Sequence, residues 1–75
     1  MTKEEFLIAL EDILQRENPC LENDTLNDYD EWDSLSKMSI MAYYSQNFGI
    51  QLTLQQFKEI QTVSDLISLA GGNIQ

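Results

Sequence analysis

Few side chains in this sequence could take part in catalysis. The 75 residues include no histidine, one cysteine and 13 acidic residues. A serine nucleophile needs a nearby base, and histidine, the commonest one, is absent. Two carboxylates can serve as acid and base only where their surroundings separate their pKa values. The acidic residues here fall on a predicted solvated helix face or in an acidic loop, so we expect no independent catalysis. We interpret the chain as a substrate or partner of other proteins.

The acidic segment of residues 22–33 does not fit the pattern of a metal site. A calcium loop of the EF-hand type needs oxygen ligands at its first, third and fifth positions. A loop that starts at Asp28 puts Trp32 at the fifth position, and one that starts at Asp24 puts Leu26 at the third. Zinc lacks ligands because the chain has one cysteine and no histidine. The sequence therefore predicts no metal site.

The charge of the chain is large and unevenly placed. The formal net charge is −9, and 11 of the 13 acidic residues precede Ser34, together with two of the four basic ones. Such a chain repels phosphate backbones and anionic lipids, which makes basic protein surfaces better partners than nucleic acid or a membrane surface. No apolar run approaches the ~18–20 residues of a membrane span, and the first residues do not resemble a signal peptide. We expect a cytoplasmic monomer with one domain, residues 1–75, in which Cys20 is a partly buried thiol without a disulfide partner.

Helical periodicity and capping signals predict an all-α fold. A threonine followed three residues later by Glu, Gln or Asp marks a helix start at Thr2, Thr53 and Thr62. Apolar spacing predicts an amphipathic helix over about residues 3–16, a short helix after Thr53, and a last helix that Gly71-Gly72 stops. With the helix described next, these elements make a four-helix bundle with one short member.

A further helix is expected to begin at Asp33 or Ser34 and to run to about Asn47, with Gly49 as its stop. Its apolar side chains form two stripes on nearly opposite sides. One consists of Ile40, Met41, Tyr44 and Phe48, and the other of Leu35, Met38 and Ala42. A small bundle easily buries only one stripe, which leaves two interpretations open. Either the helix is buried on a broad arc, or Leu35, Met38 and Ala42 form an exposed stripe that docks onto a partner.

The connection before this helix, residues 17–33, is long for so small a domain. It has no sustained periodicity, and Leu21 and Leu26 are its expected core anchors. Unstructured connections above roughly 12–15 residues are often functional, and this one leads directly to Ser34.

The segment Glu31-Trp32-Asp33-Ser34-Leu35 resembles the Asp-Ser-Leu attachment motif of acyl carrier proteins. That family consists of small acidic four-helix bundles with a long first loop and a short third helix. Two later segments also resemble it, Phe48-Gly49-Ile50-Gln51-Leu52 and Ile60-Gln61-Thr62-Val63-Ser64-Asp65-Leu66, so the likeness covers nearly the whole chain. It implies that a phosphopantetheinyl transferase attaches 4′-phosphopantetheine from coenzyme A to Ser34, with Asp33 and Leu35 completing the motif. It also implies that the terminal thiol carries acyl groups as thioesters between acyl-loading and acyl-transfer enzymes.

The resemblance weakens on the helix that follows Ser34. Carriers of primary fatty acid synthesis have acids there for docking, whereas this sequence has Ser36, Ser39, Ser45 and Gln46 and adds Lys37. Trp32 stands where those carriers have a small residue. These departures favour a dedicated biosynthetic pathway, with docking through Leu35, Met38 and Ala42 and steering by the acidic loop.

Two other functions remain open. A carrier of the same covalent class could load an amino acid, as D-alanyl and peptidyl carriers do, although Asp-Ser-Leu differs from the peptidyl pattern. From another class, the chain could be an unmodified helical adaptor that keeps the fold without the attachment.

Overall fold

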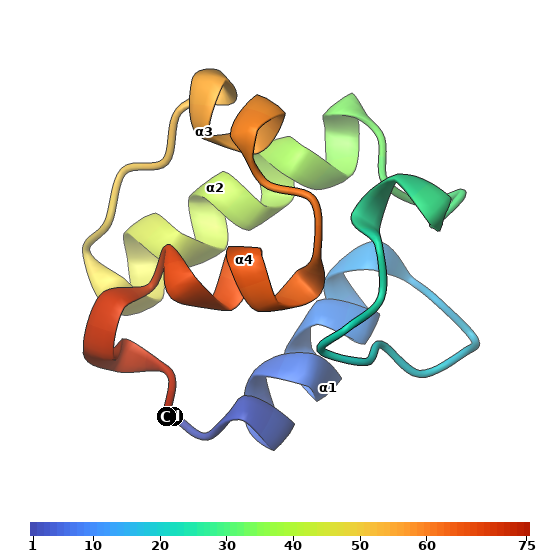
Figure 1. Ribbon diagram of the computed structural model, residues 1–75. Coiled ribbons are helices and arrows are strands. Elements are labelled where there is room, and N and C mark those ends of the chain that lie inside the picture. The colour runs from blue at the N-terminus through green and yellow to red at the C-terminus, as the bar shows by residue number, and fades with distance from the viewer.

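The computed structural model describes all residues 1–75 and consists of helices and their connections (Figure 1). The elements are α1 (Lys3–Leu14), α2 (Ser34–Phe48), α3 (Leu54–Glu59) and α4 (Val63–Ser68), with short 3-10 turns at Leu26–Asp28 and Gly71–Asn73. The predicted all-α bundle with a short third helix is confirmed. The last helix is as short as the third.

The local start signals explain where the helices begin. Thr2, Thr53 and Thr62 each accept a hydrogen bond from the backbone three residues on, and that residue's side chain bonds back to the threonine N–H. These are the predicted capping boxes, and each satisfies backbone donors that a helix start leaves unpaired. Gly49 ends α2 in the left-handed region (φ 67°), as its place in the sequence predicts.

The end of α1 differs from its prediction. The helix stops at Leu14, because Gln15 adopts a left-handed conformation with φ 56° and ψ 44°. The N–H of Gln15 then donates to the carbonyl of Asp12, and that of Arg16 to Glu11. This pair of bonds closes the helix without the glycine that usually occupies such a position. Arg16 therefore lies outside the helix and reaches the long loop.

The buried core draws on every helix and on the loop. Its centre is Tyr44, whose hydroxyl donates to the carbonyl of Leu66 at 2.6 Å. The stripe of α2 with Ile40 and Tyr44 faces this core. The other buried apolar residues are Phe6, Leu10, Leu14, Cys20, Leu26, Tyr29, Leu52, Phe57, Val63, Leu66, Ile67, Ala70 and Ile74.

The loop before α2 is packed against the end of the chain. Leu26 donates its N–H to Gln61 at 2.8 Å, while Val63 and Ser64 donate to carbonyls of residues 24 and 22. Of the two predicted anchors, Leu26 is buried, but Leu21 is 59% exposed and that prediction was wrong. Tyr29 fills the anchoring role instead, because the 3-10 turn at Leu26–Asp28 turns both Leu26 and Tyr29 inward. The loop is thus an ordered part of the fold.

Candidate functional site

Ser34 is the first residue of α2 and is exposed. Its hydroxyl makes no hydrogen bond within the protein, and neither do the backbone N–H groups of Ser34 and Leu35. Free N–H groups at the start of a 15-residue helix, together with the helix dipole, favour an anion. The hydroxyl of Ser34 is therefore accessible, and the backbone around it suits a negatively charged substituent.

Asp33 fixes the start of the helix just before Ser34. Its carboxylate accepts the N–H of Ser36 at 2.9 Å, and the hydroxyl oxygen of Ser36 accepts the N–H of Asp33 at 3.0 Å. Ser36 is only 8% exposed, so it serves the cap and adds nothing to the outer surface. The sequence did not predict this role, because Asp33 and Ser36 have the spacing of a capping box but not its usual residue types, Ser or Thr followed by Glu or Gln.

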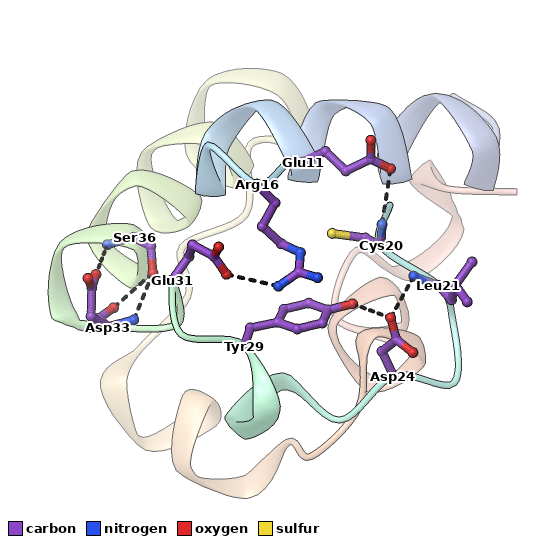
Figure 2. A network of polar contacts seen from close by, with 9 residues as sticks. All are labelled: Glu11, Arg16, Cys20, Leu21, Asp24, Tyr29, Glu31, Asp33 and Ser36. Atoms are coloured by element: carbon purple, nitrogen blue, oxygen red, sulfur yellow. Dashed lines mark hydrogen bonds and ion pairs between the residues drawn. The ribbon is translucent and has the colours of Figure 1, made fainter. Parts of the chain in front are cut away.

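A polar network holds the loop that leads to this start (Figure 2). The guanidinium of Arg16 donates to Glu31 at 2.8 Å and lies 3.8 Å from the centre of the Tyr29 ring. The Tyr29 hydroxyl in turn donates to Asp24 at 2.6 Å. Burial, and then the hydrogen bond to Asp24, raise the pKa of Tyr29 well above its usual range. The network ties the segment before Asp33 to the end of α1.

Cys20 lies at the inner side of this network and is buried. Burial raises the pKa of its thiol, which keeps it protonated and unreactive at neutral pH. The backbone N–H of Cys20 donates to Glu11 at 3.1 Å. Its place agrees with the prediction of an unpaired thiol, though it is more deeply buried than predicted.

A groove of about 650 Å³ opens beside Ser34, between the first turns of α2 and helix α3. Its lining is largely apolar but includes two ammonium groups and no carboxylate. The lining residues are Asn27, Ser34, Lys37, Met38, Met41, Leu54, Phe57, Lys58 and Ile60. The sequence did not reveal this groove, because its walls come from segments about 20 residues apart that meet only in the folded chain.

Trp32 links the loop to the wall of the groove. Its ring meets Phe57 edge to face at 5.8 Å between centroids, and the Lys37 ammonium lies 5.5 Å from its centre. Trp32 is half-buried in this position. The residue that departs from the acyl carrier pattern therefore packs against both α2 and α3.

The second apolar stripe of α2 is exposed. Leu35 is 74% and Met38 63% exposed, and Ala42 is exposed as well. The interpretation of a helix buried on a broad arc is therefore wrong, because Tyr44 and its neighbours fill the core by themselves. Leu35 follows Ser34 directly, Met38 borders the groove and Ala42 lies one turn further on, so the stripe runs from Ser34 along the helix.

A comparison with protein families gives one finding. The family model described as the phosphopantetheine attachment site matches residues 4–70, which is most of the chain. The chain belongs to this family. It is a carrier domain to which 4′-phosphopantetheine becomes covalently attached, and such domains are carriers without catalytic activity of their own. Comparisons with curated proteins and with solved structures found no match.

The surroundings of Ser34 fit such a group. The carrier offers at Ser34 an unbonded hydroxyl, two unpaired N–H groups that suit a phosphodiester, and an adjacent groove that is largely apolar. A carrier of this kind implies a phosphopantetheinyl transferase and acyl-handling enzymes as partners. None of its helices has the length and apolar character that crossing a membrane requires.

Proposed function

We propose that this carrier is an acyl carrier protein of a dedicated biosynthetic pathway and that Ser34 is its attachment residue. The observation that carries the proposal is the exposed, unbonded Ser34 hydroxyl at the capped start of α2, beside a groove lined by apolar side chains. Asp33 and Leu35 complete the attachment motif on either side. A cytoplasmic location, where coenzyme A is available, is part of this proposal.

During attachment the Ser34 oxygen would form a bond to the phosphorus of the pantetheine phosphate, and the pyrophosphate bond of coenzyme A would break to release adenosine 3′,5′-bisphosphate. We assign the base that takes the serine proton to the transferase, because the carrier has no histidine and one oxygen of the Asp33 carboxylate already accepts the Ser36 N–H. The unpaired N–H groups of Ser34 and Leu35 then face the negative charge of the product. Once attached, the group supplies a thiol on a flexible arm that holds an acyl group as a thioester.

The apolar groove supports an acyl cargo over an aminoacyl cargo. Methionine, leucine, phenylalanine and isoleucine side chains shield an alkyl chain from water, at about 0.8 kcal/mol for each buried methylene group. A small aminoacyl group carries a positive charge and gains little from these side chains. The cations that border the groove also repel an aminoacyl ammonium group.

Partner enzymes would meet two different surfaces. The stripe of Leu35, Met38 and Ala42 offers apolar contact next to the attachment residue, and the loop and α1 carry most of the negative charge. A basic patch on the partner would speed encounter with the charged part, and the stripe would supply contact at short range. The nearly neutral α2 supports partners other than those of primary fatty acid synthesis.

Intact mass spectrometry tests the attachment. The carrier is incubated with coenzyme A and a promiscuous phosphopantetheinyl transferase, alongside Ser34→Ala and the matched variant Ser39→Ala, which removes another exposed serine of α2. We expect one added phosphopantetheine on the native chain and on Ser39→Ala, and none on Ser34→Ala. No increase on the native chain would favour the unmodified adaptor, and an equal increase on Ser34→Ala would move the attachment elsewhere. Thioesters recovered from cells then separate acyl from aminoacyl cargo.

A further inference from the structure

The four basic residues of this acidic carrier divide into two kinds. Lys3 pairs with Glu22 at 3.8 Å, and Arg16 pairs with Glu31 at 2.8 Å. Lys37 and Lys58 form no ion pair, although the chain has 13 acidic residues. Both of these lysines line the groove beside Ser34, Lys37 from α2 and Lys58 from α3.

The groove therefore contains both of the basic side chains that form no ion pair with a carboxylate. Its lining contains no Asp or Glu, and Asn27 and Ser34 are its other polar residues. Lys37 is half-buried and its ammonium lies over the Trp32 ring, so part of its hydration has been replaced by an aromatic face. Two ammonium groups that border the same apolar surface repel each other, and a bound anion would offset this repulsion.

We propose that the groove selects acyl groups that carry a carboxylate, so that the cargo is the half-thioester of a dicarboxylic acid. This inference rests on the proposed function of Ser34. The methylene chain of such a cargo would lie against Met38, Met41 and Phe57, and its carboxylate would meet Lys37 and Lys58. The groove volume of about 650 Å³ falls within the ~300–1,000 Å³ typical of small-molecule sites.

The phosphodiester of the arm is the other anion near this groove. The unpaired N–H groups of Ser34 and Leu35 at the start of α2 are available to donate hydrogen bonds to the negatively charged phosphodiester. Lys58 comes from the opposite wall, on α3, and the Met38 and Leu54 side chains of the groove are apolar. A ligand that combines an apolar chain with a negative charge can contact both the apolar side chains and the lysines of this lining, whereas a phosphate group alone contacts only the lysines.

The test compares two cargoes of equal chain length on the complete carrier. Glutaryl and pentanoyl groups are attached to the arm through an amide in place of the thioester, and loading is confirmed by mass. Methionine methyl groups labelled with carbon-13 report on the groove, since Met38 and Met41 line it and Met1 does not. We expect glutaryl to move the Met38 and Met41 signals further than pentanoyl at low salt, with Met1 unchanged. The difference should shrink as ionic strength rises.

Lysine variants assign the effect to the groove. Lys37→Gln and Lys58→Gln should each lower the groove-bound population of glutaryl by about two- to fivefold, the range expected for one partly exposed charge pair. Lys3→Gln removes a lysine that is already paired and should change nothing. Equal signals from the two cargoes, or lysine variants that do not distinguish them, would overturn the proposal. So would an equal effect of the variants on the arm without cargo, because the anion would then be the phosphodiester. Failure to load Ser34 would instead contradict the proposed function.

Discussion

Replacing Asp33 with alanine tests whether the cap before Ser34 holds the start of α2. The change removes the acceptor of the Ser36 N–H, a bond of 2.9 Å. Loss of a helix cap costs about 0.5–2 kcal/mol, and this N–H belongs to a residue only 8% exposed, where water replaces the lost partner poorly. We therefore expect the free energy of unfolding to fall by about 1–2 kcal/mol. For a domain of this size the midpoint of thermal unfolding should drop by roughly 5–15 °C.

Thermal and urea unfolding followed by far-UV circular dichroism measure this change, and two variants separate its causes. Asp33→Asn keeps a cap oxygen and should lose no more than a few tenths of a kcal/mol, while taking up phosphopantetheine more slowly because the charge beside Ser34 is gone. Ser39→Ala removes an exposed hydroxyl that bonds only to the carbonyl of Leu35, and should be neutral. A native midpoint for Asp33→Ala would refute the reasoning, since the cap would then contribute nothing to the fold.

Three further predictions concern docking, the loop and pH. Ala42→Asp should slow acyl loading of the modified carrier by its acyl-transfer enzyme, while Ser34 is still modified as in the native chain. Ala42→Ser should behave like the native chain. Unchanged loading of both variants would show that the exposed stripe is not a docking surface. Arg16→Met removes the ion pair with Glu31 and the cation over the Tyr29 ring. We therefore expect the free energy of unfolding to fall by about 1–3 kcal/mol and the backbone amide of Trp32 to exchange faster. Unchanged exchange would show that other contacts hold the loop. Burial raises the pKa of Tyr29, so the folded chain keeps a proton that the unfolded chain releases above pH ~10; stability should fall as pH rises past that point, with a smaller slope in Tyr29→Phe when urea midpoints are compared between pH 8 and 11.

The parts of the fold that the sequence predicts well depend on neighbouring residues. The caps at Thr2, Thr53 and Thr62 and the stop at Gly49 are set within a few positions of the chain, so their spacing identifies them. The segment around Ser34 that resembles the attachment motif is likewise contiguous, and the family it indicated is confirmed. A short-range pattern can be recognised without knowing what packs against it.

The features of the fold and of the site that the sequence did not predict depend on residues that come into contact only after folding. Leu21 and Tyr29 could not be assigned correctly, because the loop has no period and its inward face is set by hydrogen bonds to residues 61–64. The groove likewise required Lys37 and Lys58 to approach from different helices. Composition indicated an acidic chain, and only the folded chain shows that the side chains of Lys37 and Lys58 line the same groove beside Ser34.

The hydrogen bonds that fasten the loop also set an order of events during synthesis. The segment before Ser34 is held by Gln61, Val63 and Ser64, which leave the ribosome long after α1 and α2. Contacts between such distant positions form late, because most of the chain must be present before they can close. A transferase that recognises the fastened loop would therefore act only after residues 61–64 have been made and have folded against residues 22–26.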